Sequence, residues 1–148
     1  MDQVAIRQHL FGLLSTQISS LQQQLSEIET ARNEETKSSA GDKFETSREM
    51  MQQAADQVQG QLDRTQELLQ QLKRLSEPVQ NDRIEEGHLV HTDKGIYFLS
   101  VPFGKIKGLP DTVYALSVAS PLGKLLLGKS QGDVVTFNQR EILIKDFF

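Results

Sequence analysis

Two long segments of the chain repeat apolar residues at every third or fourth position. The first series, separated mainly by Gln, Ser and Glu, consists of Leu14, Ile18, Leu21, Leu25 and Ile28. The second series consists of Met51, Ala54, Val58, Leu62, Thr65, Leu69, Leu72 and Leu75. This spacing places each series on one stripe of an α-helix. Because each helix has a single apolar stripe, we expect the two to pack together as an antiparallel coiled-coil hairpin.

The apolar repeat fails once, in residues 37–45, and we expect the tip of the hairpin there. Ser38, Ser39 and Gly41 weaken a helix, because serine competes for backbone hydrogen bonds and glycine costs about 1 kcal/mol relative to alanine. Pro78 is predicted to end the second helix, because proline cannot extend one. Residues 1–77 are therefore predicted to form an arm roughly 45–50 Å long, at 1.5 Å of rise per residue.

The predicted tip carries two carboxylates, Asp42 and Glu45. Their spacing is typical of a capping box, in which each side chain accepts a hydrogen bond from a backbone amide at the start of the helix. Carboxylates one helical turn apart can also share a hard cation such as Mg²⁺, with other ligands from a partner. Both interpretations stay open, since one pair of residues can do both. Phe44, between them, indicates contact with another molecule.

Beyond residue 78 the apolar pattern changes to one typical of strands. We expect strands at Leu89–His91, Ile96–Val101, Val113–Val118, Val134–Phe137 and Glu141–Phe147, with a loop from Pro102 to Pro110. Turns are expected at residues 92–95 and 138–139. Ser120 and Pro121 predict the start of a short helix that ends before Gly128. Residues 78–148 are therefore predicted to form a small antiparallel sheet domain with one short helix, of the α+β class.

Charge is distributed unevenly along the chain. Residues 1–78 hold 8 basic and 12 acidic residues, whereas residues 79–148 hold 8 of each, so the net charge of −4 lies on the arm. This distribution argues against direct binding to DNA or RNA, which requires clustered cations, and favours a protein partner. The lack of cysteine excludes disulfides and thiol chemistry and suits the cytoplasm. No apolar run predicts a membrane span or a signal peptide.

Three further patterns are weak indicators of a site. Residues 123–130 match the phosphate-binding loop formally, but no helix is predicted to begin at Lys129, so we do not expect nucleotide binding. His88 and His91 have no third ligand nearby in the sequence, and we expect surface histidines and no zinc site. With no Trp and few other aromatic residues, the chain shows no obvious apolar pocket for a proline-containing peptide.

Two motifs give the chain a family resemblance. Residues 120–129, Ser-Pro-Leu-Gly-Lys-Leu-Leu-Leu-Gly-Lys, followed by Gly132-Asp133-Val134, resemble the C-terminal signature of bacterial Gre-type transcript cleavage factors (GreA/GreB-like). Residues 41–45 resemble the Gly-Asp-x-x-Glu tip of the same family. The order of a coiled-coil hairpin followed by an FKBP-like sheet domain is also that of the family. The resemblance implies a monomer that acts as a transcription elongation factor and has no active site of its own.

The resemblance also implies a partner, bacterial RNA polymerase. The C-terminal domain would dock at the rim of the secondary channel, and the arm would carry Asp42 and Glu45 to the polymerase active centre. There the two carboxylates would help to hold the polymerase's second Mg²⁺ while backtracked RNA is hydrolysed, with only indirect contact to the RNA 3′ end. No cofactor of its own is implied. The expected partner contacts are Lys43, Phe44 and Arg48 near the tip, and Ser120, Pro121, Leu122 and Gly123 in the sheet domain.

Other functions remain open at this point. The family usually continues Asn-Ala-Glu-Tyr after the tip glutamate, whereas this chain has Thr46-Ser47-Arg48-Glu49. A related protein could therefore occupy the secondary channel and inhibit transcription without stimulating cleavage. The coiled coil could instead belong to an adaptor that dimerises. A third possibility is peptidyl-prolyl isomerase activity, which the FKBP-like fold alone does not establish.

Overall fold

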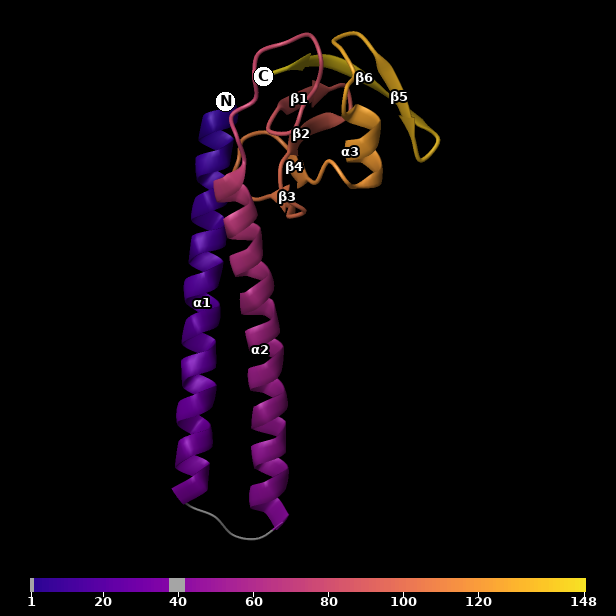
Figure 1. The fold of residues 1–148 in the computed structure, drawn as a ribbon. Helices are drawn as coiled ribbons and strands as arrows, with labels where there is room; N and C mark the ends of the chain where they lie inside the picture. The colour runs from indigo at the N-terminus through magenta and orange to yellow at the C-terminus, as the bar shows by residue number, and fades with distance from the viewer. Residues whose placement is uncertain (1, 38–41) are drawn as a thin grey trace. The chain divides into compact units, whose positions relative to one another are not determined.

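The computed structural model describes residues 2–37 and 42–148, and the chain divides into two compact units. One unit is Gly12–Leu69, and the other combines Met1–Phe11 with Gln70–Phe148. The elements, in chain order (Figure 1), are α1 (Gln3–Lys37), α2 (Asp42–Arg74), β1 (Leu89–Thr92), β2 (Gly95–Leu99), β3 (Gly104–Ile106), β4 (Val113–Leu116), α3 (Pro121–Leu126), β5 (Val134–Phe137) and β6 (Arg140–Phe147). The fold is therefore two long helices followed by a sheet with one short helix, as the sequence predicts.

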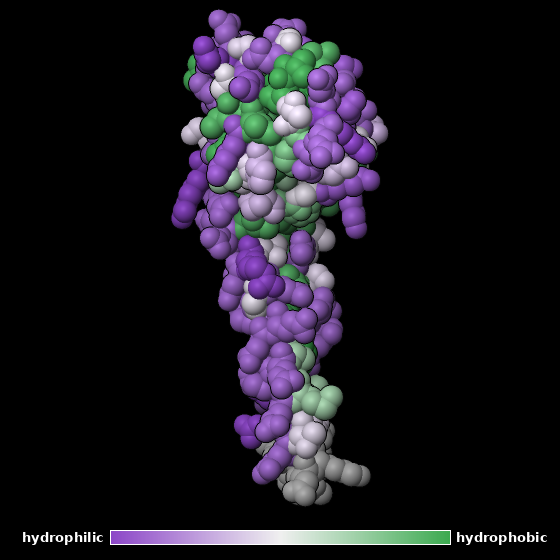
Figure 2. Space-filling model, turned by 90° about the vertical axis from the view of Figure 1, so that its right-hand side faces the viewer, coloured by the Kyte–Doolittle hydropathy of each residue, from purple (hydrophilic) through white to green (hydrophobic). Residues whose placement is uncertain are grey.

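The helical unit is a pair of antiparallel helices (Figure 1). Every residue of the two predicted stripes that falls in this unit is buried or half-buried, and Leu14, Leu21 and Leu62 are among the most buried. The Arg32 guanidinium donates a hydrogen bond of 2.6 Å to Oε1 of Gln52 on the other helix. Along the long helices, the face seen in Figure 2 is mostly hydrophilic. The predicted coiled-coil pairing is confirmed for this unit.

The chain reverses direction between the end of α1 at Lys37 and the start of α2 at Asp42. This position agrees with the tip predicted at residues 37–45. The helix-weakening residues at positions 38–41, on which the prediction relied, lie outside the described residues.

The second helix ends earlier than predicted, at Arg74 and not at Pro78. Its last carbonyl groups are bound by a side chain from α1, since the Arg7 guanidinium donates to the carbonyl oxygens of Leu72 at 3.0 Å and Leu75 at 2.5 Å. A cation at this position also opposes the negative end of the helix dipole. The helix therefore ends where an external donor satisfies its carbonyls, four residues before the proline.

The sheet unit includes the first turns of α1 and the last turn of α2. Ile6 and Leu10 of α1 and Leu72 of α2 are buried within it, and Nε2 of His9 lies 2.7 Å from the carbonyl oxygen of Lys107. The first turns of α1 are thus fastened to the segment that follows β3. The predicted domain boundary between residues 77 and 78 stays a prediction, whereas the compact units divide within both long helices.

The sheet has six strands in the order β3-β4-β2-β1-β6-β5. Most neighbours are antiparallel, as predicted, but β2 and β4 are parallel. Strand β3 is a correction, because the sequence predicts only a loop from Pro102 to Pro110. Its three residues pair with β4, and pairing to a distant strand leaves little periodicity for so short a segment.

Helix α3 and one face of the sheet enclose the core of the unit. Its members are Ile84, Val90, Leu99, Leu122, Leu126, Val135, Ile142 and Ile144. The predicted start of α3 is confirmed, since Oγ of Ser120 accepts a hydrogen bond of 3.0 Å from the Gly123 amide and Pro121 is the first helical residue. The predicted end is confirmed as well, because Gly128 follows the helix with φ +80°, a conformation that glycine adopts without strain.

Candidate functional sites: the acidic tip and an aromatic groove

The first candidate site is the start of α2, where the sequence places two carboxylates. Asp42 is the first residue of the helix, and the exposed Glu45 follows three positions later. Residues three apart on a helix lie on the same side, so the backbone brings the two positions together. The side chains of Asp42, Lys43 and Phe44 lie outside what the structure describes. The predicted capping box and the predicted contact through Phe44 stay predictions.

The donor chemistry of this pair fits a shared Mg²⁺ ion. Carboxylate oxygen is the ligand that Mg²⁺ prefers, but two carboxylates provide fewer than the about six ligands of its octahedral shell. Among the side chains that the structure describes, of which Asp42 is not one, no group of three or more His, Asp or Glu is arranged to hold a metal. Asp42 and Glu45 therefore fit an ion whose remaining ligands come from another molecule.

Two further charged residues accompany Glu45 on α2. Arg48 is one turn beyond it, and Glu49 follows; all three are exposed. A cation one turn from a carboxylate offsets part of its charge. The opposite charges of Arg48 and Glu49 offset each other, so together they leave the formal net charge near Asp42 and Glu45 unchanged.

The second candidate site is a groove of about 750 Å³ in the sheet unit. Its walls come from β2 and β4, from the start of α3 and from the β5–β6 hairpin. Three of the predicted partner-binding residues, Ser120, Pro121 and Leu122, line it. The fourth, Gly123, is buried within α3.

Gly123 has a structural reason to be glycine. A Cβ atom at this position would lie 2.1 Å from the carbonyl oxygen of Ser117 and 2.9 Å from Cα of Val118. The helix therefore packs directly against the backbone of the preceding loop. This contact holds the start of α3, and with it the groove wall, in place.

Aromatic side chains dominate one side of the groove. Tyr97 on β2 and Tyr114 on β4 are paired in register, and their rings stack with centroids 6.0 Å apart and an interplanar angle of 26°. Burial is the main reason why the pKa of Tyr97 is raised above its usual value. Phe137 of β5 lines the groove as well. Strands far apart in the sequence thus bring the few aromatic residues together in an apolar groove, whereas the expectation that the chain has no apolar pocket for a proline-containing peptide stays a prediction.

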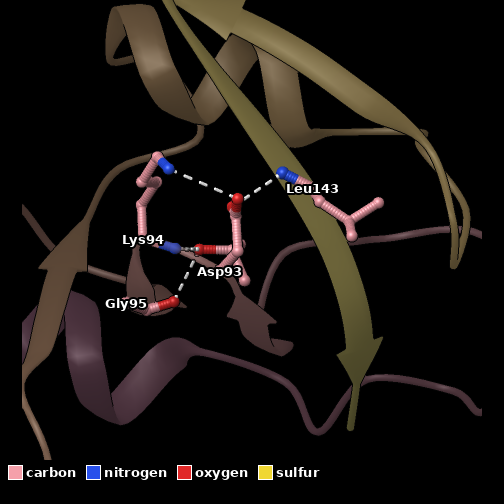
Figure 3. Close-up of polar contacts among 5 residues, drawn as sticks. Asp93, Lys94, Gly95 and Leu143 are labelled. Atoms are coloured by element: carbon pink, nitrogen blue, oxygen red, sulfur yellow. Dashed lines mark hydrogen bonds and ion pairs between the residues drawn. The ribbon is translucent and has the colours of Figure 1, made fainter.

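The charged residues in the lining of the groove are both cationic, Lys94 and Arg140. Lys94 belongs to the β1–β2 turn, where its Nζ lies 3.4 Å from Oδ2 of Asp93 (Figure 3). Arg140 has no carboxylate within 4.0 Å in the described part of the chain. The groove is therefore apolar with a positively charged rim.

Asp93 fixes the turn beside the groove. Its Oδ1 accepts a hydrogen bond of 2.9 Å from the Leu143 amide (Figure 3), and its own amide donates to the Leu143 carbonyl at 3.2 Å. The Leu143 amide is the main reason why the pKa of Asp93 is lowered. Asp93 thus continues the pairing of β1 with β6 past Thr92, after the register shift between His91 and Thr92.

Comparison with known proteins adds little to this geometry. No protein-family model matches the chain, and no curated protein matches it. One solved structure that it resembles is described as "Structure of the transcription factor Gfh1", with 22% identity over 90% of each chain and a TM-score of 0.36. A TM-score this low supports no conclusion about the present chain.

The histidines differ from the expectation of surface residues. His88 precedes β1 and is 2% exposed, and its Nδ1 accepts a hydrogen bond of 2.7 Å from the Glu85 amide. Burial is the main reason why the pKa of His88 is lowered. His91 is half-buried, with its ring edge-to-face against Phe148. The sequence missed the burial of His88 because an isolated histidine before a short strand gives no periodic signal.

Residues 123–130 do not have the geometry of a phosphate-binding loop. Gly123 lies inside α3, and the chain runs from Gly128 through a turn to β5, so no helix begins at Lys129. The carbonyl oxygen of Lys129 instead accepts a hydrogen bond of 2.8 Å from the Ile84 amide. None of the helices in the described ranges has the length and apolar composition needed to cross a membrane.

Proposed function

We propose that this protein is a Gre-like transcription elongation factor that binds bacterial RNA polymerase and stimulates its Mg²⁺-dependent cleavage of backtracked RNA. The observation that carries the proposal is the reversal of the chain between Lys37 and Asp42, directly beside the exposed Glu45. The motif resemblance at residues 41–45 and 120–134 supplies the identity of the partner. The protein would be a cytoplasmic monomer and would have no catalytic activity alone.

The dimensions of the helices suit delivery of a group to a distant centre. Helices α1 and α2 have 35 and 33 residues, and at 1.5 Å of rise per residue each is about 50 Å long. A pair of helices this long and only two helices wide encloses no cavity for a substrate. Chemistry at its end therefore has to be completed by another molecule.

At the polymerase centre, Asp42 and Glu45 would add carboxylate oxygens to a metal site that the polymerase itself completes. Mg²⁺ bound there stabilises the attacking and leaving oxygens of a phosphodiester displacement. Glu45, as an exposed carboxylate, can also accept a hydrogen bond from the attacking water and orient it. Sequestered in the channel, both charges would act in a lower dielectric than in water, where they interact more strongly.

A second function, inhibition without cleavage, is favoured by one observation. Arg48 lies one turn from Glu45 on α2. The family that this chain resembles usually has a glutamate at the position of Arg48. A cation at this distance weakens the attraction of the tip for a metal ion. A factor with such a tip could occupy the channel and block substrate entry. Cleavage and elongation assays with the same protein separate the two functions.

The decisive variant is Asp42→Asn, because asparagine caps a helix about as well as aspartate but carries no charge. We expect it to bind core RNA polymerase like the wild type and to stimulate cleavage in stalled complexes at least about tenfold less, as loss of a metal-supporting group does. The matched control is Asp63→Asn, which removes an exposed carboxylate from the same helix far from the tip.

The outcomes distinguish the candidate functions. Full cleavage activity in Asp42→Asn would reduce Asp42 to a helix cap and refute the proposed mechanism. Wild-type protein that binds polymerase and slows elongation without stimulating cleavage would establish the inhibitory function. Light scattering that gives the mass of a dimer would favour the coiled-coil adaptor.

A further inference from the structure

We propose that Arg32 is a positioning residue, which holds the two long helices in the one register that directs the tip carboxylates correctly. Its guanidinium on α1 donates a hydrogen bond of 2.6 Å to Oε1 of Gln52 on α2. The fixed register follows from the two helices themselves, whereas its importance for RNA cleavage rests on the proposed function.

Arg32 occupies a position of the α1 stripe at which the repeat predicts an apolar residue. The stripe runs through Leu25 and Ile28, and the next step of four residues reaches Arg32. Arg32 is half-buried, whereas Asn33 and Glu34, which follow it, are exposed. A polar residue at one position of a coiled-coil seam specifies the register of the helices, at a cost in stability. The location of Arg32 is therefore typical of a residue that determines pairing.

Few apolar side chains near the tip could set the register instead. Beyond Ile28, α1 contains Ala31 and no larger apolar residue before it ends at Lys37. A single methyl group packs about equally well at several offsets, because it is too small to fill a hole in the partner helix. On α2 the stripe begins with Met51, whose flexible side chain adapts to different neighbours. The register near the tip therefore depends on the hydrogen bond between Arg32 and Gln52.

The acceptor of this hydrogen bond is itself held in place. Nε2 of Gln52 donates a hydrogen bond of 2.9 Å to Oδ1 of Asp56, one turn further along α2. This bond orients the Gln52 amide, because the nitrogen faces Asp56 and the oxygen is left for the guanidinium. Arg32, Gln52 and Asp56 thus form a chain of hydrogen bonds that runs from one helix to the other and continues along it.

The chain of hydrogen bonds is coupled to the tip through α2. Gln52 lies seven residues after Glu45, which is about two turns or roughly 10 Å along the same side of the helix. Between them α2 is continuous, so a rotation or shift of the helix at Gln52 moves Glu45 with it. The contact with Arg32 therefore determines the direction and the height at which the backbone presents Glu45.

A stabilising role is the alternative, and the two roles predict opposite results for Arg32→Leu. Leucine would extend the apolar stripe by one position, and replacing a polar seam residue with an apolar one often leaves stability unchanged or raises it. We expect the urea midpoint of the helical unit, followed by circular dichroism, to stay the same or rise. The register, in contrast, should lose its specification.

The first experiment measures cleavage in stalled complexes at saturating concentrations of each variant. We expect Arg32→Leu to reduce the stimulated rate about tenfold or more, because displacing a catalytic group by about 1 Å can cost a hundredfold. Its affinity for core RNA polymerase should change by less than about twofold. Arg32→Lys, which keeps a cationic donor, should retain at least about half of the rate. Arg64→Leu is the matched control, since it replaces an exposed arginine of the same unit.

Gln52→Ala tests the same hydrogen bond from the other helix. Removing the acceptor should lower the cleavage rate about as much as Arg32→Leu does. The double variant should be no worse than either single variant, because residues that act through one shared contact are not additive. Defects that multiply in the double variant would show that the two residues act separately and would overturn the inference.

The second experiment measures the register directly. The chain has no cysteine, so Glu34→Cys and Gln53→Cys introduce two unique sites for spin labels, one on each helix. Pulsed electron paramagnetic resonance should give one narrow distance for otherwise wild-type protein. With Arg32→Leu we expect a broader distribution or a second distance, displaced by up to about 5 Å, the rise of one helical turn.

The outcomes separate this inference from the proposed function. An unchanged narrow distance in Arg32→Leu would overturn the inference, and so would full cleavage despite a changed distance. A lower urea midpoint with an unchanged distance would assign Arg32 a stabilising role and overturn it as well. Wild-type protein that does not stimulate cleavage would refute the proposed function, and the distances would then decide alone whether Arg32 fixes the register.

Discussion

The close contact of Gly123 with the loop before α3 makes Gly123→Ala the sharpest test of how the groove is built. The added methyl group would lie 2.1 Å from the Ser117 carbonyl oxygen, whereas ordinary contact begins at 3.4 Å. The helix or the loop must therefore move by about 1.3 Å, the difference between these distances. Because the obstructing atom belongs to the backbone, no rotation of a side chain can relieve the contact.

The cost of this movement can be set against the gain in helix propensity. Overpacking of a buried site usually costs about 1–3 kcal/mol, and alanine recovers up to about 1 kcal/mol relative to glycine in a helix. We expect a net loss of about 1–2 kcal/mol in the free energy of unfolding of the sheet unit. For a unit of this size, that corresponds to a fall in Tm of roughly 4–16 °C.

Tyrosine fluorescence is a suitable assay, because the chain has two tyrosines and no tryptophan. Both tyrosines, Tyr97 and Tyr114, lie in the groove, so their signal reports on the sheet unit and not on the long helices. Urea denaturation followed by this signal should show a lower midpoint with an unchanged slope. Binding to polymerase should weaken too, because the displaced helix carries Ser120 and Pro121 in the groove wall.

Gly60→Ala provides the control with the opposite sign. Gly60 lies within α2, and a Cβ there would meet only Nη1 of Arg64, at 3.4 Å, the end of a flexible side chain. We expect it to stabilise the helical unit by about 0.5–1 kcal/mol. A Gly123→Ala protein as stable as the wild type would refute the reasoning about the close backbone contact.

Substitutions at three other positions test contacts that hold the sheet unit together. Because burial lowers the pKa of His88, the folded protein binds its proton less readily than the unfolded chain, and the free energy of unfolding should fall as the pH drops below 6.5, the usual pKa of histidine. His88→Gln should therefore have a lower Tm near pH 7.5 but lose less of it on acidification, and equal pH dependence would contradict this. Asp93→Ala should lower the Tm slightly by freeing the Leu143 amide, and Asp93→Asn, which keeps an acceptor, should restore it. The contribution of the ionised Asp93 carboxylate should be lost as the pH falls below 3.8, because its pKa is lowered. Arg7→Met should cost about 1–2 kcal/mol by leaving the last carbonyls of α2 without donors, and an unchanged urea midpoint would show that water replaces them.

The parts of the fold that follow from local patterns are predictable from the sequence. The stripe that includes Leu14 and Leu62 sets the two helices, because a period of 3.6 residues over many turns has few alternatives. The start of α3 at Ser120 and Pro121 is likewise local chemistry of capping. The β5–β6 hairpin follows from its two-residue turn, in which Asn138 and Gln139 have φ of 50° and 65°.

Features that depend on distant residues were not predictable. Strand β3 exists through its pairing with β4, and the parallel pairing of β2 with β4 depends on where the intervening chain passes. The end of α2 depends on Arg7, which is 65 positions from Leu72. No window of the sequence contains both partners of such contacts.

The two candidate sites also differ in how far the sequence alone predicts them. Asp42 and Glu45 are neighbours along one helix, so the sequence alone brings them together. The groove is assembled from residues between Lys94 and Ile142, on five strands, one helix and the turns beside them. The sequence indicated only the contribution of α3, through its resemblance to a known motif.

The hydrogen bond between Asp93 and Leu143 has a consequence for the electrostatics of the groove. It holds β6 in a register in which Arg140 and Ile142 face the cavity, while Glu141 and Leu143 lie on the other side. A slip of one residue would exchange these two sets, because strand residues alternate. The rim would then present the carboxylate of Glu141 in place of the guanidinium of Arg140. The turn residue Asp93 therefore determines the sign of the charge at the rim of the groove.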